Sequence, residues 1–327
     1  MQIYKFNNIL KPVLWGGSKL LAFKGIAASD EPIGESWELS AMPGHESVVA
    51  DGDDCGLTLS QLVKRYGADL VGKDVYRRYG DQFPLLIKLI DACRDLSLQV
   101  HPDDNMARRL HGCAGKNEMW YILEAEDGAV IRNGFNRTIT PEAFDRMLAD
   151  GTVLDVVNSK ESRPGDVFYI PAGQIHAIGA GNLFVEVQQA SDITYRVWDY
   201  NRMDADGNLR PLHVQEAREA LSYAAHDGLV PPIPSLTPGF TPLVMSPDFD
   251  VYRLDFDNGY TLDMAWNHSF VALMCIEGQT ELTAASMPTV ALRQGETALV
   301  PAVVERLDMS GKASLMMTTV PVVPPQE

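Results

Sequence analysis

One short stretch, GDVFYIPAGQIH at residues 165–176, limits the possible folds more than any other part of the sequence. Gly165 predicts a turn, the apolar run after it predicts a strand, and Pro171 with Gly173 predicts a second tight turn that ends the strand. His176 follows this turn, and its side chain is expected to point inward as a metal ligand. Further strands are predicted at 118–123, 183–189 and 192–200. Such spacing is typical of a β-sandwich or β-barrel.

Three other stretches have the period of an amphipathic helix, at 57–71, 140–151 and 213–223. The second opens with Thr140 and Pro141, a helix N-cap followed by a proline in the first turn. We expect these stretches to form helical insertions around a β core.

A proline-rich segment, LVPPIPSLTPGFTP at residues 229–242, predicts the main domain boundary. Proline supplies no backbone donor and continues neither a helix nor a central strand. The chain becomes β-like again after it. We therefore expect a larger domain at 1–228, a linker at 229–242 and a smaller β domain at 243–327.

The net charge of −17, from 44 acidic and 27 basic residues, argues against a nucleic-acid or anionic membrane partner, because both need a basic surface. The most apolar stretches, at 84–90 and 298–304, are far shorter than the roughly 20 residues that span a bilayer. The polar N-terminus predicts a cytoplasmic protein. The 4 cysteines have no CxxC spacing, which argues against a structural zinc or a disulfide framework.

Four residues predict one metal site. Gln99 and His101 are two residues apart in LSLQVHPDD, so on a strand both side chains project from the same face. Glu118 begins an alternating strand, and His176 follows the turn described above. Two imidazoles, a carboxylate and an amide oxygen suit one Zn²⁺ per chain, with Mn²⁺, Fe²⁺ or Co²⁺ as competitors. A single histidine on a strand is more often a surface or core residue, and only the combination favours a metal.

Charged residues near these ligands are candidates for substrate contact. Lys116 precedes Glu118 by two residues and shares its predicted strand face, although a surface lysine is an equal alternative. Lys88 lies in the apolar run PLLIKLI, where burying an unpaired charge would be costly. We expect it either to line the pocket or to pair with a carboxylate such as Glu186. His111 leads towards Glu118 and is a weaker candidate.

The remaining histidines, His45, His213, His226 and His268, have no partner at ligand spacing and are expected to be exposed or hydrogen-bonded structural residues. In TYRVWDY, alternation predicts Thr194, Arg196 and Trp198 on one strand face. From the residues alone, Arg196 is either functional or a surface arginine that keeps its head in water.

Several blocks together resemble type I mannose-6-phosphate isomerase (phosphomannose isomerase) of the cupin superfamily. They are LWGG at 14–17, IGESWELS at 33–40, PLLIKLIDACRDLSLQVHPDD, GKNEMWYIL, RPGDVFYIPAGQIHAIG and VEVQQASDITYRVWDY. The resemblance covers roughly residues 1–220. One departure is Ala180, where the cupin motif often has Asn.

This resemblance implies a mainly β fold, with a cupin (jelly-roll) β-barrel that carries helical insertions and the active site, followed by a degenerate second cupin-like domain. In the second domain Gly295 and Pro301 keep the turn pattern, but Val304 stands where the first copy has His176. The resemblance also implies zinc bound by residues corresponding to Gln99, His101, Glu118 and His176.

The implied reaction interconverts mannose 6-phosphate and fructose 6-phosphate through an enediol, with Arg196 as the catalytic arginine. Lys116, Lys88 and Glu186 are then expected to bind the phosphorylated sugar, and the protein to be a monomer or homodimer. The catalytic base stays open between a metal-bound water, Glu186 and His111. Three alternatives also stay open: an iron-dependent dioxygenase, a non-catalytic sugar-phosphate-binding cupin, and an isomerase or epimerase for another phosphosugar.

Overall fold

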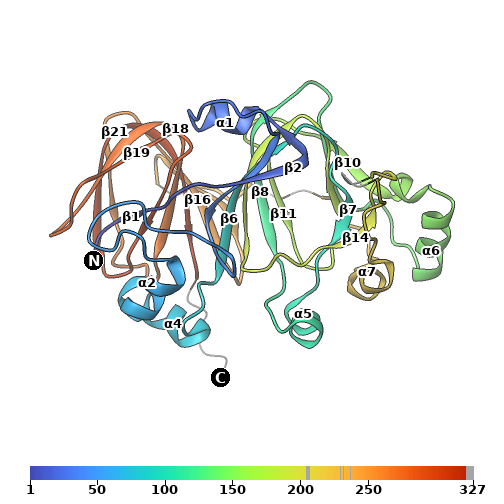
Figure 1. The fold of residues 1–327 in the computed structure, drawn as a ribbon, viewed down its shortest axis with the longest axis horizontal. Coiled ribbons are helices and arrows are strands. Elements are labelled where there is room, and N and C mark those ends of the chain that lie inside the picture. The colour runs from blue at the N-terminus through green and yellow to red at the C-terminus, as the bar shows by residue number, and fades with distance from the viewer. Residues whose placement is uncertain (204–206, 229, 231, 236, 322–327) are drawn as a thin grey trace.

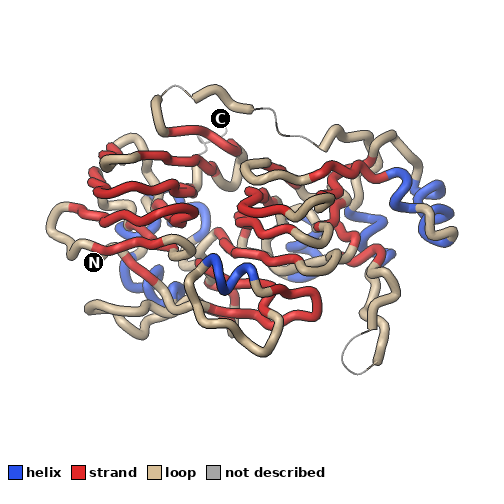
Figure 2. The backbone as a smooth tube through the Cα atoms, turned by 90° about the horizontal axis from the view of Figure 1, so that it is seen from above, coloured by secondary structure: helices blue, strands red, loops and turns tan. Residues whose placement is uncertain are grey.

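The computed structural model describes residues 1–321 except 204–206, 229, 231 and 236, so part of the predicted linker lies outside the described residues. Three larger antiparallel sheets make up most of the molecule, and the helices lie around them (Figure 1). Seen from above, the strands form two stacks, and the N-terminus lies beside the stack built by the C-terminal strands (Figure 2). The expectation of a mainly β protein with helical insertions is confirmed.

Two sheets form the first stack. The six-stranded sheet has the order β11 (Val167–Ile170), β8 (Glu118–Ala125), β13 (Asn182–Gln189), β6 (Leu85–Ala92), β3 (Ile33–Leu39) and β2 (Ile9–Gly17). The five-stranded sheet has the order β10 (Val157–Glu161), β9 (Val130–Phe135), β12 (His176–Ile178), β7 (Leu98–Val100) and β14 (Tyr195–Trp198).

An apolar core that includes Trp120, Ile122, Ile131, Phe168 and Phe184 fills the space between these two sheets. Within the described residues no ladder of hydrogen bonds joins the sheets to each other. The arrangement is therefore a double-sheet jelly roll, as expected, and its two sheets do not close into a continuous barrel.

The C-terminal strands build the third sheet. Its order is β1 (Tyr4–Lys5), β20 (Thr297–Val300), β18 (Val271–Ala284), β21 (Arg306–Thr319), β16 (Asp250–Phe256) and β15 (Phe240–Met245), with β17 (Tyr260–Asp263) on β21 and β19 (Val290–Arg293) on β18. Two strands of this sheet include residues outside the range 243–327. Strand β15 begins inside the range expected to be linker, and β1 comes from the opposite end of the chain.

The six-stranded sheet has two buried faces, which explains its long apolar strands. One face borders the core described above. The other packs against the C-terminal sheet through side chains that include Ile87, Leu89, Val185, Met274 and Met316. The C-terminal β domain thus supports the back of the sheet that carries β8 and β13.

A buried ion pair lies at the same interface. Lys24 Nζ lies 2.5 Å from Glu38 Oε1, and only 3% and 4% of the two side chains are exposed. Glu38 also accepts hydrogen bonds from Ser36 at 2.5 Å and from Thr297 of β20 at 3.4 Å, while Lys24 donates to the Gly295 carbonyl at 2.5 Å. These contacts join β3 directly to the C-terminal sheet.

The helices only partly follow the predictions. They are α1 (Lys19–Phe23), α2 (Leu59–Tyr66), α3 (Ala68–Val71), α4 (Lys73–Tyr79), α5 (Asp104–His111), α6 (Pro141–Ala149) and α7 (Val214–Ala220), with a 3₁₀ turn at Val153–Val156 and a small hairpin of β4 (Ala41–Met42) and β5 (His45–Glu46). The predicted helix at 57–71 divides at Gly67, whose φ of +48° ends α2. Thr140 caps α6 by accepting from the Ala143 N–H at 3.2 Å. Helices α1, α4 and α5 were not predicted.

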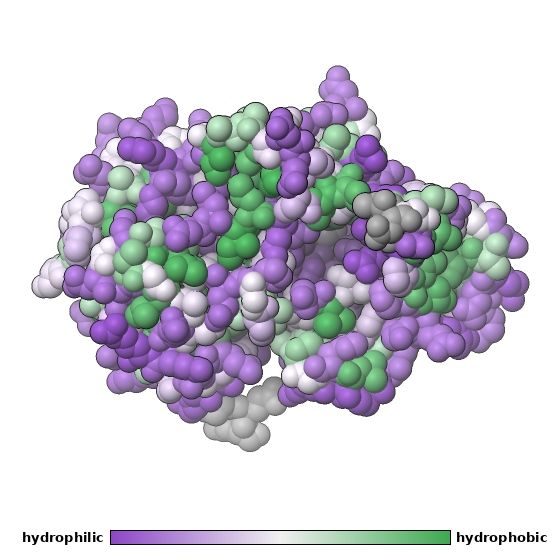
Figure 3. Space-filling model, viewed as in Figure 1, coloured by the Kyte–Doolittle hydropathy of each residue, from purple (hydrophilic) through white to green (hydrophobic). Residues whose placement is uncertain are grey.

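The outer face of the five-stranded sheet packs mainly against α6 and α7. The face of the molecule seen in Figure 3 is mostly hydrophilic, with apolar side chains in separate patches. Among the described residues, no helix is long and apolar enough to cross a membrane. The 4 cysteines are free thiols, as expected.

Candidate metal centre

Strand register places three of the predicted site residues in one row. His176 on β12 pairs with Gln99 on β7, and Gln99 pairs with Arg196 on β14. Their neighbours Ala177 and Val197 pack in the outer core below α6 and α7, so the three polar side chains belong to the inner face of the sheet. This alternation is what the spacing in the sequence predicted for Gln99.

The facing sheet supplies the carboxylate. Glu118 is the first residue of β8 and is fully buried. Its Oε1 lies 3.4 Å from His176 Nε2, and its Oε2 lies 3.5 Å from His101 Nε2. His101 follows β7 directly and is 1% exposed. The ligand atoms of these three residues lie within 4.8 Å of one another.

Backbone carbonyls orient both imidazoles. His101 Nδ1 lies 2.8 Å from the Ile193 carbonyl oxygen, and His176 Nδ1 lies 2.9 Å from that of Gln174. A carbonyl oxygen only accepts, so each Nδ1 carries the proton and each Nε2 presents a lone pair on the side of Glu118. Lys116 Nζ lies 3.3 Å from His101 Nε2, so this lone pair accepts from the ammonium group. This second contact of the ring is the usual arrangement of a metal-binding histidine.

Two further observations show that these residues fit a divalent metal ion. Both Glu118 oxygens are buried, and neither accepts a hydrogen bond of normal geometry in the part of the chain that the structure describes. The separations of 3.4 and 3.5 Å match the roughly 3.3 Å expected between ligands of a tetrahedral ion with bonds of about 2.0 Å. No other group of three His, Cys, Asp or Glu residues converges in this way among the described residues.

The protonation states also suit metal binding. Burial lowers the pKa of His101 to about 4 and lowers the pKa of His176 below its usual value, so both rings are neutral at neutral pH. Burial alone would raise the pKa of the Glu118 carboxyl, but Lys116 and the two imidazoles outweigh it and hold the pKa well below its usual range. Neutral imidazole and carboxylate are the forms that bind a metal.

Gln99 lies beside this group but presents its amide nitrogen. Gln99 Nε2 is 3.2 Å from His176 Nε2, while its Oε1 accepts from the Ser97 hydroxyl at 3.2 Å. Ligation by the amide oxygen therefore requires a turn about the last side-chain bond, which exchanges two nearly isosteric groups.

A buried charge network extends from the triad across the six-stranded sheet. Lys116 Nζ lies 2.6 Å from Glu118 Oε2 and 3.9 Å from Glu186 Oε1. Lys88 donates to Glu186 Oε2 and to Gln188 Oε1, both at 2.9 Å. The alternative that Lys88 pairs with Glu186 is thus what the structure contains. Burial would lower the pKa of Lys88, but Glu186 and neighbouring carboxylates outweigh it and raise the pKa.

Sequence reasoning missed Trp120. Its Nε1 donates to Glu186 Oε1 at 3.1 Å, and its ring meets the His176 ring edge-on with 5.5 Å between centroids. The signal was present, because Trp120 is two residues after Glu118 on the same strand and therefore on the same face.

Arg196 lies on β14 beside Gln99 and is partly buried. Burial and the nearby Arg210 lower its pKa, while Asp199 opposes this change. The prediction that Arg196 and Trp198 share a face is wrong, because a bulge after Arg196 sets Trp198 opposite Leu98. Trp198 packs with the outer core instead.

The other histidines lie away from the triad. His111 Nε2 contacts the Tyr195 hydroxyl at 2.7 Å, and Tyr195 packs in the outer core, so His111 is on the opposite side of the sheet from Gln99. His45 contacts Lys11 at 2.6 Å, and His213 and His226 accept hydrogen bonds from backbone N–H groups. These three residues are hydrogen-bonded, as expected.

Comparison with known proteins decides the family. A model of the phosphomannose isomerase type I catalytic domain matches residues 3–130, and a model of the mannose-6-phosphate isomerase cupin domain matches residues 240–320. The mannose-6-phosphate isomerase of Streptococcus mutans is 33% identical over 305 residues, 93% of each protein. This chain belongs to the type I mannose-6-phosphate isomerase family. Mannose-6-phosphate isomerase ManA of Bacillus subtilis is 41% identical over 217 residues, 66% of this chain and 67% of that protein.

Solved structures of isomerases in the family have the same fold. A crystal structure of mannose 6-phosphate isomerase from Bacillus subtilis superposes with a TM-score of 0.89 at 31% identity, covering 98% of this chain and 100% of that one. A phosphomannose isomerase variant from Salmonella typhimurium gives 0.81 at 18% identity, with 98% and 100% covered, and supports the fold alone. The cupin prediction is confirmed, and Val304 lies buried in the core of the C-terminal cupin domain.

Proposed function

We propose that this chain is a metal-dependent aldose–ketose isomerase that interconverts mannose 6-phosphate and fructose 6-phosphate through an enediol. One observation carries the proposal: the buried ligand atoms of His101, Glu118 and His176 converge within 4.8 Å of one another in a chain of this family. An oxygenase reading is disfavoured, because the relatives across most of the chain are named as isomerases.

One Zn²⁺ per chain is the proposed cofactor, held by the triad with Gln99 as a fourth ligand after its amide turns. The mixed nitrogen and oxygen set also accepts other divalent metals. When bound, zinc would supply a Lewis acid for a carbonyl or hydroxyl oxygen of the sugar.

The isomerisation moves a proton from C2 of the aldose to C1 of the ketose. Of the two side chains considered as the base, His111 lies on the other face of the sheet, bound to Tyr195. We assign the proton transfer to Glu186, whose carboxylate is fixed by Lys88 and Trp120.

Cationic side chains are proposed to hold the substrate and its developing charge. Lys116, 4% exposed and beside Glu118, would donate to an oxygen of the sugar. Arg196 stays protonated despite burial, because a guanidinium ordinarily loses its proton only far above neutral pH, and it stabilises the enediolate or the phosphate. Lys88 lies on the inner face of the six-stranded sheet, beside Glu186. In a chain with a net charge of −17, such a local cluster is what attracts a phosphorylated sugar.

Three sequence predictions remain proposals: division of the chain at 229–242, a monomeric or homodimeric state, and a cytoplasmic location.

A coupled assay of fructose 6-phosphate formation tests the function. Purified protein is measured with mannose 6-phosphate, with other hexose and pentose phosphates, after chelation, and after zinc is restored. Turnover of mannose 6-phosphate that is lost with chelation and regained with zinc supports the proposal. Turnover confined to another phosphosugar refutes the substrate, and binding without turnover in a metal-loaded sample refutes an enzymatic role.

A further inference from the structure

His213 makes an unusual double contact with Arg196. The His213 N–H donates to the Arg196 carbonyl oxygen at 2.8 Å, and the Arg196 N–H donates to His213 Nδ1 at 3.3 Å. Strand β14 is the edge of the five-stranded sheet, with β7 on its other side. One residue therefore satisfies both outward-facing backbone groups of Arg196, in the place where a further strand would pair.

The main chain of Arg196 needs such support. The bulge that follows Arg196 interrupts the ladder to β7 between the Arg196–Gln99 and Trp198–Leu98 pairs. Arg196 Nε is buried and has no hydrogen-bond partner among the described residues. Within the described part of the chain, no hydrogen bond at Nε therefore holds the side chain, and His213 fixes the backbone from which the side chain starts, on the open side of the strand.

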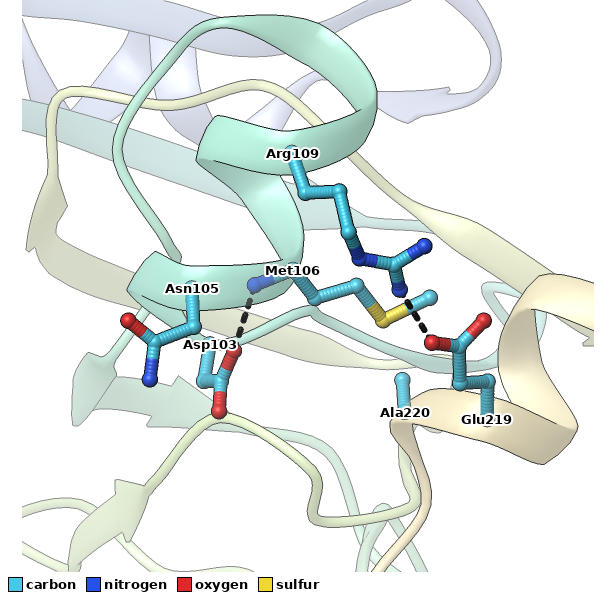
Figure 4. A pocket seen from close by; sticks show the side chains of 6 residues that line it. All are labelled: Asp103, Asn105, Met106, Arg109, Glu219 and Ala220. Atoms are coloured by element: carbon cyan, nitrogen blue, oxygen red, sulfur yellow. Dashed lines mark hydrogen bonds and ion pairs between the residues drawn. The ribbon is translucent and has the colours of Figure 1, made fainter.

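Helix α7 holds His213 in place. His213 is the residue before α7, and Arg109 of α5 forms an ion pair with Glu219 near the other end of α7 (Figure 4). The end of α7 is also tied to the turn before His176, because the Ser222 N–H donates to the Gly173 carbonyl at 2.8 Å. Gly173 has no room for a side chain here, since a Cβ would lie 2.9 Å from the Ala220 carbonyl oxygen.

We infer that His213 is a positioning residue that aligns Arg196 for the isomerisation, acting through the acceptor Nδ1 and not by touching substrate. The inference rests on the role proposed above for Arg196. Accurate placement matters because a shift of about 1 Å in a catalytic group can lower turnover by roughly 100-fold.

Three substitutions separate this role from simple packing. In His213→Asn the amide oxygen is as many bonds from the backbone as Nδ1 and still accepts from Arg196. In His213→Gln the amide is one bond further away, and in His213→Ala it is absent. We expect kcat to fall about 10- to 100-fold in the Gln and Ala variants and to stay within about threefold in the Asn variant.

A matched control removes the same kind of bond elsewhere. His226 Nδ1 accepts from the Gly228 N–H at 2.8 Å, outside both β14 and α7. His226→Ala should leave kcat unchanged. Metal content and melting temperature are measured for every variant, so that lost folding is not read as lost alignment.

A double-mutant cycle with Arg196→Ala completes the test. If His213 acts through Arg196, adding His213→Ala to Arg196→Ala lowers kcat no further. A further fall of similar size, or equal losses in the Asn and Gln variants, overturns the inference. Normal turnover in His213→Ala together with low turnover in Arg196→Ala also overturns it. Normal turnover in Arg196→Ala instead refutes the role of Arg196 on which it depends.

Discussion

Replacing Glu118 by glutamine tests the metal centre through a change of charge alone. The substitution keeps the shape of the side chain and removes the anion between His101, His176 and Lys116. A four-ligand zinc site is worth about 10–16 kcal/mol, so one ligand contributes on average about 3 kcal/mol, or roughly 100-fold in affinity. We expect zinc affinity to fall by at least that factor, because Glu118 is the anionic member of the triad.

The same change should weaken the metal-free fold. Lys116 Nζ loses a partner at 2.6 Å while only 5% of its side chain is exposed. Breaking a buried ion pair costs about 3–5 kcal/mol, and Glu186 at 3.9 Å offers partial compensation. A loss of about 3 kcal/mol is therefore expected, which corresponds to a fall of roughly 6 °C in melting temperature.

The assay is competition with a chromophoric chelator, together with melting curves with and without EDTA. Glu124→Gln is the matched control, because Glu124 lies on the same strand but is exposed. Glu124→Gln should change neither the zinc affinity nor the melting temperature of the metal-free protein. Unchanged zinc affinity in Glu118→Gln would refute the ligand assignment, and an unchanged metal-free melting temperature would refute the account of Lys116.

Three further outcomes follow from single side chains. Arg196→Ala should keep bound zinc and the melting temperature but lower kcat by about 100-fold or more; near-normal kcat contradicts its role. Burial raises the pKa of Asp250 to about 6, so the fold favours the protonated acid and loses stability as pH rises from about 4 to 6. Asp250→Asn should then raise the unfolding free energy at pH 7.5 by about 1 kcal/mol, allowing for partial exposure, and have little effect at pH 4 in urea titrations. Glu38→Ala should lower the unfolding free energy by about 3–5 kcal/mol in the same titrations, because it leaves Lys24 buried without its ion-pair partner. The control Glu126→Ala, at an exposed ion pair, should lower it by less than about 1 kcal/mol. Equal losses in the two variants would contradict this prediction.

Local signals in the sequence predict which candidate site residues share a strand face, whereas much of the surrounding fold depends on long-range pairing. The two-residue spacing of Gln99 and His101 and the turn before His176 are local signals, and local register decides which face such side chains share. Trp198 was misplaced because a bulge depends on the pairing with β7, which alternation in one strand does not contain.

Long-range contacts account for most of what the sequence left out. The pairing of β1 with β20 joins residues almost 300 positions apart, and two residues give no periodic signal. Helix α5 is only 8 residues long and begins within the HPDD segment, where its Asp103 cap resembles an ordinary turn residue. The contact of His213 with Arg196 likewise depends on how α7 docks beside an edge strand.

We propose that one metal ion in the His101, Glu118 and His176 triad is required for isomerisation. The most direct measurement is turnover of mannose 6-phosphate by metal-free protein as zinc is added in known amounts. Turnover should start near zero, rise linearly and level off at one equivalent per chain, and His176→Ala should show no rise. Full turnover before zinc is added, or an equal rise in His176→Ala, would contradict the account.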